Sequence, residues 1–469
     1  MTDAPTWAAP SPTGPVHARV RVPGSKSLTN RWLVLAALAG GVSTLRHPLR
    51  SQDSERMVAA LRALGALVDD TDEGRWSVTP PPGGLVGDTD VDCGQAGTVM
   101  RFVPPLAGLA TGPVHFDGHP SARTRPVGPV LAALRALGIG VQDDDRGTLP
   151  FTVVGSGRPR RTLGDDHEDH ADGGGDGAGR TARPVPRVPI DASASSQFVS
   201  ALLLAGAAYP DGLRLEHVGR DVPSLPHIEM TLEVLARVGV QVERPTPTSW
   251  VVRPGPVDPF DVTVEPDLSS AAPFLALAAV TGGRVVVPDW PAVTTQPGDR
   301  MRTILASMGA GTRLSADGLV ADGGPDGRLR GVDLDLSEVG ELTPVVAALA
   351  ALAQGPSRLR GIGHLRGHET DRLAALVTEL SRLGADARET DDGLVIDPAP
   401  LRPATLQTYH DHRMAMFAAV VGARVPGVRV VDVATAGKTF PGFDRAWERA
   451  VATSNIGGSG ISGTTGSAG

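Results

Sequence analysis

Two kinds of helical segment alternate along the chain. The first is an Ala/Leu-rich helix that follows a cluster of small polar residues, and the second is an amphipathic helix that ends at Gly and runs into a strand. Each kind recurs about every 70 residues, with one longer step near 100. The first kind begins near Ser27, Gly97, Ser196, Ser270, Thr343 and His412, and the second ends at Gly65, Gly138, Gly239, Gly309 and Gly384.

The length of this period predicts the architecture. Solenoid repeats are shorter, so about 70 residues with two helices and several short strands indicate a repeated α/β unit. Six units divide most simply into two domains of three. We expect one domain over 24–264 and the other over 265–455, to which residues 1–23 return a strand. The sixth copy is degenerate and includes the stretch 443–451.

The longer step falls at the same place in both series. Residues 155–187 are rich in Gly, Asp, Arg and Pro and contain almost nothing to bury, which predicts a disordered surface insertion. We interpret the DDHEDH run inside it as a solvated acidic loop, because no second cluster with metal-ligand spacing follows. The Gly/Ser-rich tail, 456–469, is predicted to be disordered as well.

Composition narrows the class of protein. The chain has 469 residues, a net charge of −8 and a single cysteine, Cys93. It shows neither an apolar run long enough for a bilayer nor the order of a signal peptide. We expect a cytoplasmic protein without a disulfide framework and without nucleic-acid or membrane partners. Only two of the 44 basic residues are lysines, Lys26 and Lys438, which suggests sites where a compact ammonium matters.

The loops that precede helices carry most of the candidate chemistry. In residues 24–31, Lys26 and Arg31 flank a helix start that Ser27 or Thr29 is expected to cap. Such a start favours a phosphate or carboxylate, and equivalent helices that point the same way would converge on one cleft. This implies two anionic substrates, or one with several phosphates. The cations expected there are Lys26, Arg31, Arg125, Arg372, Arg413 and Lys438.

Two glutamates lie in the same loops. Glu341 and Glu369 are candidates for general acid–base work, although either can instead cap its helix or pair with an arginine. His368 and His412 either share proton transfer or donate hydrogen bonds to a phosphate. We interpret Cys93 as a buried thiol at a strand end, since no histidine lies near it in sequence. No metal-ligand spacing is present, so no metal is expected.

Seven short motifs occur in order with consistent spacing: GSKSLTNR, QAGTVMR, RTRPVG, SASSQF, GHETDR, YHDHRMAM and AGKTFPGF. Together they resemble the 5-enolpyruvylshikimate-3-phosphate synthase family, of an actinobacterial type, from about Val16 to about Arg449. The resemblance implies an α/β fold of two domains, each with three βαβαββ units in an inverted α/β barrel, joined by two crossings. That fold agrees with the sixfold period.

The resemblance also implies the reaction. The enolpyruvyl group of phosphoenolpyruvate passes to the 5-hydroxyl of shikimate 3-phosphate, and phosphate is released. The resemblance implies that the enzyme is a monomer and needs no cofactor. Catalytic roles are implied for Lys26, for Glu341 as the base for the hydroxyl, and for Glu369 in moving a proton at the methylene carbon. Shikimate 3-phosphate is expected at Lys26, Ser27, Arg31, Ser195, Ser196, Gln197, Ser224, Glu341 and His368. Phosphoenolpyruvate is expected at Lys26, Gly97, Arg125, Gln197, Arg372, Arg413 and Lys438.

Several positions depart from the family pattern. His227 stands where a Tyr is common, His364 where many members have Asn, and His368 where many have Lys. Gln95 replaces a common Asn, and the acid at Glu341 is often Asp. If His368 takes the place of a lysine, binding of the acceptor should weaken as the pH rises through its pKa.

Two alternatives remain open. A sister family transfers enolpyruvate to UDP-N-acetylglucosamine and shares the fold, but it typically has Asn where this chain has Ser27. It also carries a cysteine in a mobile loop, whereas the loop 119–125 here has none. The other alternative is a non-catalytic protein that senses sugar phosphates. The pairing of Glu341 and Glu369 with the two lysines argues against it.

Overall fold

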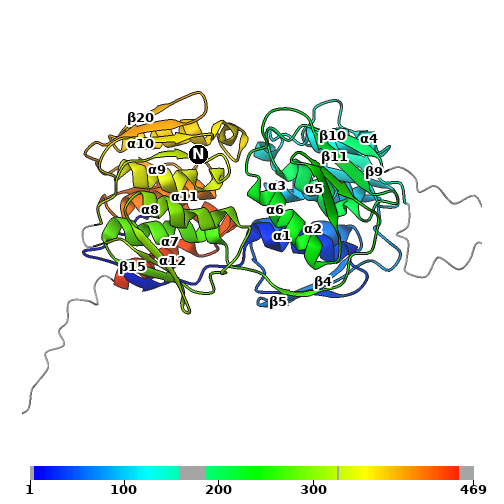
Figure 1. Cartoon of the computed structure of the whole chain (residues 1–469), viewed down its shortest axis with the longest axis horizontal. Coiled ribbons are helices and arrows are strands. Elements are labelled where there is room, and N and C mark those ends of the chain that lie inside the picture. Colours follow the sequence, from blue (N-terminus) through cyan, green and yellow to red (C-terminus); the bar gives the residue numbers. More distant parts are fainter. Residues whose placement is uncertain (1–4, 158–184, 325–326, 454–469) are drawn as a thin grey trace, which may run out of the picture.

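Two lobes lie side by side in the computed structural model, which describes residues 5–157, 185–324 and 327–453 (Figure 1). The buried hydrophobic residues form two separate clusters. One lies within 28–264 and defines the first lobe; the other joins 9–20 with 268–451 and defines the second lobe. The predicted insertion lies outside the described residues except at 155–157 and 185–187, and the predicted tail lies wholly outside them.

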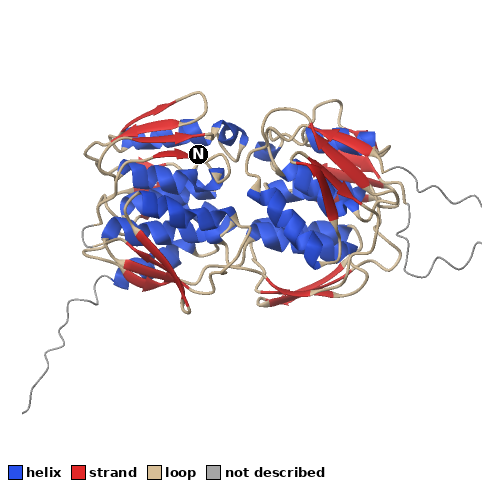
Figure 2. Ribbon diagram, viewed as in Figure 1, coloured by secondary structure: helices blue, strands red, loops and turns tan. Residues whose placement is uncertain are grey.

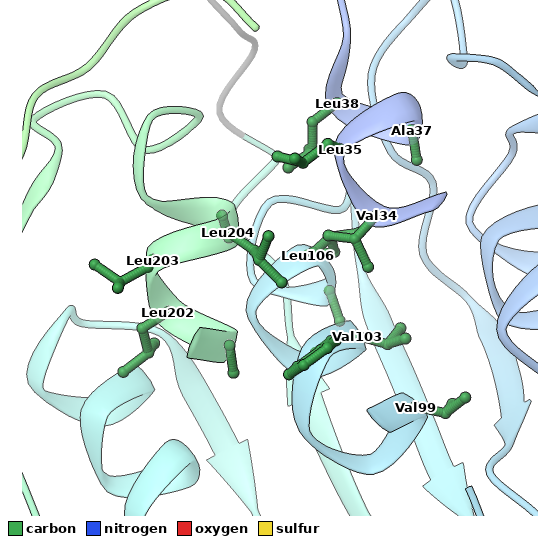
Figure 3. Close-up of a cluster of buried hydrophobic side chains, with 14 of the residues drawn as sticks. Val34, Leu35, Ala37, Leu38, Val99, Val103, Leu106, Leu202, Leu203 and Leu204 are labelled. Atoms are coloured by element: carbon green, nitrogen blue, oxygen red, sulfur yellow. The ribbon is translucent and has the colours of Figure 1, made fainter. Parts of the chain in front are cut away.

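The Ala/Leu-rich segments form buried helices. Every residue of α7 (Leu268–Thr281) and α11 (His412–Gly422) is buried, because apolar side chains cover all sides of both helices. In the first lobe, Leu35, Val103 and Leu203 come from three such helices and lie in one cluster (Figure 3). The other α-helices are α1 (Lys26–Leu38), α2 (Gln52–Ala63), α3 (Gly97–Ala107), α4 (Gly128–Ala136), α5 (Gln197–Gly206), α6 (Pro226–Arg237), α8 (Met301–Ser307), α9 (Thr343–Ala351), α10 (Arg372–Arg382) and α12 (Phe443–Ala452).

Small sheets cover the outer faces of these helices (Figure 2). Five of the sheets formed by the described residues have four strands and one has three, which confirms six α/β units. In spatial order they are β14 (Asp261–Thr263), β3 (Ser43–Arg46), β5 (Arg75–Thr79), β4 (Leu67–Asp72); β6 (Thr89–Asp92), β7 (Pro113–Asp117), β9 (Phe151–Val154), β8 (Gly140–Gln142); β10 (Arg187–Ile190), β11 (Leu213–His217), β13 (Ser249–Val252), β12 (Val242–Thr246); β16 (Gly311–Ser315), β17 (Gly318–Asp322), β15 (Arg284–Val287), β2 (His17–Arg19); β18 (Asp333–Asp335), β19 (Ser357–Arg360), β21 (Leu394–Asp397), β20 (Asp386–Glu389); and β1 (Thr6–Ala8), β23 (Arg429–Val431), β22 (Thr405–Leu406).

One unit illustrates the connection. The chain runs through β6, α3, β7, α4, β8 and β9, with β6 parallel to β7 and β9 antiparallel to both β7 and β8. Each strand-to-helix turn therefore opens at the same end of its unit. This places the polar clusters ahead of the helices on one side of each lobe.

Three strands pair with units that are distant in sequence. Strand β2 precedes α1 in the chain but pairs in parallel with β15 of the second lobe. Strand β14 precedes α7 but pairs in parallel with β3 of the first lobe. Strand β1 pairs antiparallel with β23 and completes the degenerate sixth sheet. The chain therefore crosses between the lobes twice, directly ahead of α1 and α7.

The start of α1 differs from the expectation. Ser25 caps the helix, and its side chain accepts a hydrogen bond from the backbone N–H of Leu28. The prediction that Ser27 or Thr29 is the cap was wrong, because a capping residue needs extended backbone before the first turn and both lie inside it. The Thr29 hydroxyl instead accepts from the backbone N–H of Leu49 at 3.0 Å.

Candidate active site

A cavity of about 130 Å³ lies between the two lobes. Its walls come from the first turns of α1, α3, α5 and α6 on one side and of α7, α10 and α11 on the other. Free backbone N–H groups and the helix dipoles favour bound anions at such a position. The expected convergence of helix starts on one cleft is therefore observed.

Most of the residues proposed from sequence face this cavity. Arg31 and Lys438 are the exceptions and do not line it. The cavity also includes Asp53, Asp267 and Ser269, which the motifs did not single out. The proposed residues that line it are Lys26, Ser27, Gly97, Arg125, Ser195, Ser196, Gln197, Ser224, Glu341, His368, Glu369, Arg372 and Arg413.

Lys26 begins α1 and is held by two acids. Its Nζ lies 3.1 Å from Oδ2 of Asp53, a nearly buried residue in the first turn of α2. Its backbone N–H donates to Oδ2 of Asp267 at 3.2 Å, and Asp267 caps α7 in the other lobe. Asp53 therefore fixes the ammonium, while Asp267 ties the first turns of the two helices together. In sequence, Asp53 looks like any first-turn acid, so no local signal marks it.

Arg31 lies behind the cavity wall and is only 1% exposed. Its guanidinium donates to the Thr231 hydroxyl at 2.8 Å and to the backbone carbonyls of Ser27 and His227 at 3.0 and 2.9 Å. Burial lowers the pKa of Arg31 to about 9. In this structure the side chain braces the wall that carries Ser27 and His227.

The two cavity arginines of the second lobe are held by partners that are distant in sequence. Arg372 donates to both carboxylate oxygens of Asp411, at 2.7 and 3.2 Å, and Asp411 also caps α11. The adjacent Asp371 caps α10 instead. Arg413 donates to the backbone carbonyl of Ser269 at 2.8 Å. Asp411 therefore organises the starts of two helices at once.

Glu369 lies in a network of charged groups. Its Oε2 is 3.1 Å from Nδ1 of His412 and 3.3 Å from Nζ of Lys438. Burial alone would raise the pKa of Glu369, but His412 and Lys438 hold it well below its usual range. Ligand atoms of Glu369, Asp411 and His412 lie within 4.8 Å of one another, a spacing that suits a metal ion. Because Lys438 and Arg372 already neutralise these carboxylates, the geometry favours an ion-pair network.

Glu341 precedes α9 and has a different environment. Its Oε1 accepts a hydrogen bond from the Ser269 hydroxyl at 3.4 Å and lies 3.7 Å from Nε2 of His227. Burial raises the pKa of Glu341, although Arg413 opposes the shift. Burial also lowers the pKa of His227 to about 3, so this imidazole is neutral. The two glutamates of the cavity therefore have pKa values shifted in opposite directions.

His368 is neutral in this geometry. Arg372 Nη1 lies 3.5 Å from His368 Nδ1, so this ring nitrogen acts as an acceptor. Burial, reinforced by Arg372, lowers the pKa of His368 well below its usual value. The His364 ring lies 5.8 Å away, edge to face, and burial lowers its pKa too. The expected weakening of acceptor binding across neutral pH therefore does not follow from this arrangement.

Gly97 lies at the start of α3 between two arginines. A Cβ at this position would lie 2.5 Å from Nη2 of Arg125 and 2.8 Å from Nη1 of Arg101, so a side chain fits only if these groups move. Sequence reasoning missed Arg101, although it ends the QAGTVMR motif. Arg101 Nη1 donates to Oε1 of Gln197 at 3.0 Å. The motif therefore contains one more charged group than was assigned, and it contacts the cavity residue Gln197.

Cys93 has no part in the cavity. It is fully buried, and burial raises the pKa of its thiol, which confirms the structural interpretation. None of the helices in the described parts of the chain combines the length and apolar character that crossing a bilayer requires.

Two lobes of α/β units enclose a cavity lined by basic side chains and helix starts, an arrangement that suits an enzyme acting on anionic substrates. A model of the family "EPSP synthase (3-phosphoshikimate 1-carboxyvinyltransferase)" matches residues 10–165 and 177–447, and the chain belongs to this family. It is an enzyme of the shikimate pathway and transfers the enolpyruvyl group of phosphoenolpyruvate to shikimate 3-phosphate.

The chain is also similar to individual members of this family and to related solved structures. The 3-phosphoshikimate 1-carboxyvinyltransferase of Kocuria rhizophila is 53% identical over 462 residues, which cover 95% of this chain and 96% of that protein. The structure of EPSP synthase from Acinetobacter baumannii has a TM-score of 0.73 at 23% identity, over 95% of this chain and 98% of its own. The enolpyruvyl transferase NikO from Streptomyces tendae has a TM-score of 0.66 at 19% identity, over 94% and 96%. These two structures bear on the fold alone.

Proposed function

We propose that the cavity between the lobes is the active site and that Glu341 and Glu369 carry the proton transfers. The observation that supports this is the pair itself: two glutamates with opposite pKa shifts face one buried cavity rich in positive charge. Two carboxyl groups whose pKa values are shifted in opposite directions can take different roles in proton transfer.

Shikimate 3-phosphate occupies the part of the cavity next to α5 and α6. The serine hydroxyls and helix N–H groups there suit a phosphate and a polyol. Arg31 supports this wall from behind through the carbonyls of Ser27 and His227. Glu341 lies across from it and reaches the acceptor hydroxyl. The proposed contacts are Lys26, Ser27, Ser195, Ser196, Gln197, Ser224, Glu341 and His368, with Arg31 as the brace.

Phosphoenolpyruvate occupies the part next to α3, α10 and α11. A phosphate and a carboxylate need several cations at close range, and guanidinium groups bind both in bidentate geometry. Lys438 acts from outside the cavity, through its contact with Glu369. The proposed contacts are Lys26, Gly97, Arg125, Gln197, Arg372 and Arg413.

The chemistry proceeds by addition and elimination. Glu341 takes the proton of the 5-hydroxyl as the oxygen attacks C2 of phosphoenolpyruvate. Glu369 carries the proton that is added to the methylene carbon. This gives a tetrahedral intermediate with a methyl group. Glu369 then removes a proton from that methyl group while the C2–O bond to phosphate breaks. Glu341 returns to the carboxylate form when its proton passes to the departing phosphate or to solvent as the products leave. Bound anions raise the pKa of Glu369 above its value in the free enzyme, which allows it to carry the proton.

We also propose that the lobes are two domains, over 24–264 and over 1–23 with 265–455, in a cytoplasmic monomer. Two separate hydrophobic clusters support the division. Closure of the domains around the substrates would exclude water from the reacting centre. Light scattering on the purified enzyme, with and without both substrates, tests the monomer.

The reaction is tested by phosphate release from phosphoenolpyruvate. We expect release with shikimate 3-phosphate and none with UDP-N-acetylglucosamine. E341Q and E369Q should each lose turnover while calorimetry still detects binding of shikimate 3-phosphate. Turnover that survives in both variants would remove the two glutamates from the mechanism and leave the family assignment in place.

A further inference from the structure

Arg101 is a buried cation without a counter-charge. It is 6% exposed, and no described carboxylate lies within ion-pair distance of its guanidinium. Nη1 donates to Oε1 of Gln197 at 3.0 Å and to the backbone carbonyl of Gly97 at 3.4 Å, and the group lies 5.4 Å from the ring centre of Phe198. Its Nε has no hydrogen-bond partner. Burying an unpaired charge costs free energy, so its retention calls for a reason.

A second unpaired guanidinium lies beside it. Arg101 and Arg125 both approach Gly97, at 2.8 and 2.5 Å from its Cβ position. Arg125 donates to the backbone carbonyl of Gln95 at 2.9 Å, its Nε lacks a partner, and no described acid pairs with it either. The repulsion between the two groups adds to the effect of burial and lowers the pKa of Arg101 to about 9. By contrast, Arg372 has Asp411 as its carboxylate partner.

The position of Arg101 indicates that it acts through other residues. It lines a neighbouring cleft of about 740 Å³, not the cavity of about 130 Å³. Arg125, Gln197 and His368 line both spaces. Arg101 therefore contacts the cavity through Gln197 and through the charge that it adds behind Gly97.

We propose that Arg101 is a positioning residue for the phosphoenolpyruvate half of the site: it orients Gln197 and, with Arg125, holds positive charge that only a bound dianion neutralises. The inference rests on the proposed placement of phosphoenolpyruvate next to Arg125. A positioning role and a purely structural role predict different effects of replacing Arg101. Removing the charge should weaken phosphoenolpyruvate binding without destabilising the free enzyme.

The test uses R101M, which keeps most of the apolar stem against Phe198, and R101K, which keeps the charge. We expect KM for phosphoenolpyruvate to rise roughly tenfold or more in R101M and less in R101K, with kcat changed by less than about threefold. The Kd for shikimate 3-phosphate alone should change much less than KM for phosphoenolpyruvate, because Gln197 is the one proposed contact of that substrate that Arg101 touches. The Tm of free R101M should equal or exceed that of the wild type.

Arg50 provides a matched control. It also has an unpartnered Nε and lies 5.1 Å from the ring centre of Trp76, but Asp70 and Glu55 are 3.7 and 3.9 Å away and it does not line the cavity. R50M should leave KM for phosphoenolpyruvate unchanged and lower the Tm.

R125M separates this inference from the proposed function. If R125M leaves KM for phosphoenolpyruvate unchanged, the proposed placement of that substrate is wrong, and the inference fails with it. If R125M raises KM and R101M does not, only the inference about Arg101 fails. An R101M protein that does not fold, or whose Tm falls together with its affinity for shikimate 3-phosphate, would overturn the inference in favour of a structural role.

Discussion

At the scale of single residues, Glu341 and Glu369 have the same chemistry and comparable positions ahead of helices. They differ in what surrounds them. Glu369 contacts His412 and Lys438, whereas Glu341 contacts the hydroxyl of Ser269 and, at longer range, a neutral imidazole. Neighbours of opposite charge lower the pKa of one carboxyl, and burial raises that of the other. The different roles proposed for the two glutamates rest on these contacts.

Replacing Glu341 removes a proton acceptor without changing the size of the side chain. We expect E341Q to lower kcat by roughly 10²–10⁴-fold, because a positioned general base contributes about that much. Steady-state kinetics with both substrates at saturation measures the loss. The control is E338Q, three residues earlier and exposed, which should keep wild-type kcat. An E341Q enzyme within threefold of the wild type would contradict the assignment.

His368 gives a prediction about pH. Arg372, His364, Arg125 and Arg101 face it, and burial with these groups keeps the pKa low, so the ring stays neutral above about pH 6.5. We expect the ratio of acceptor KM values for H368Q and the wild type to stay constant from pH 6.5 to 8.5. Comparing the two enzymes cancels the titration of the substrate phosphate. A ratio that changes severalfold across this range would show that His368 titrates there.

At the scale of elements, the turn before α11 contacts several buried polar and charged side chains of the second lobe. Tyr409 and His410 both have left-handed backbone, with φ of 54° and 55°, which is costly for residues other than glycine. The Tyr409 hydroxyl donates to Oε1 of the fully buried Glu379 at 2.5 Å, and Oε2 accepts from the backbone of Gln407 at 3.1 Å. The carbonyl of His410 in turn accepts from Nζ of Lys438 at 2.7 Å. Glu379 thus fixes the turn.

Y409F should loosen this turn. It removes the hydrogen bond to the buried carboxylate of Glu379, which keeps only the contact of Oε1 with Nη1 of Arg382 at 3.2 Å among the described side chains on that oxygen, so we expect the free energy of unfolding to fall by about 1–3 kcal/mol. KM for phosphoenolpyruvate should rise severalfold, because the turn also positions Lys438. Urea denaturation and steady-state kinetics measure the two effects.

The chain offers a matched control in its other tyrosine. The Tyr209 hydroxyl donates to the backbone carbonyl of Pro105 at 2.7 Å, buried in the first lobe. Y209F should lower stability by a similar amount and leave KM for phosphoenolpyruvate unchanged. Equal kinetic effects in the two variants would show that lost stability alone explains Y409F.

At the scale of the whole molecule, the two crossings between the lobes pair with each other. Gly24 forms a β-bridge with Pro266, Ser25 N–H donates to the carbonyl of Glu265, and Asp267 N–H donates to that of Pro23, both at 2.8 Å. These bonds lie directly ahead of α1 and α7. The connection between the lobes therefore lies next to Lys26 and Asp267, which line the cavity.

Acid should destabilise the free enzyme through its buried histidines. The native pKa of His227 is about 3, whereas an unfolded histidine titrates near 6.5. The unfolded state therefore binds more protons between these values, and stability that is full above pH 6.5 is lost as the pH falls. The contribution is about 1.4 kcal/mol per pH unit below pH 6.5 for this residue.

The measurement is urea denaturation of the free enzyme from pH 5 to 8. H227N should lose stability less steeply below pH 6.5 than the wild type does. H410N is the control, because the side chain of His410 is 80% exposed and its Nδ1 lies 3.5 Å from Asp432. Identical pH dependence in H227N and the wild type would mean that His227 takes up a proton in the native state.

The sixfold α/β repeat and the family could both be predicted from the amino-acid sequence, because apolar periodicity and short motifs are local features that can be read along the chain. The sequence also marked most of the residues that line the cavity, since each lies in the first turn of a helix or in the loop just ahead of it. The local sequence pattern led to a wrong prediction for the cap of α1, which is Ser25. It also gave no signal for Asp53 or Arg101.

The ion-pair partners of the charged side chains, in contrast, depend on the three-dimensional packing of the chain. Arg372 pairs with Asp411, 39 residues away, and Lys438 with Glu369, 69 residues away. Arg31 and Lys438 lie outside the cavity wall although their motifs match the family. The physical reason is that charge pairing, burial and the resulting pKa values depend on distances between segments that only packing brings together.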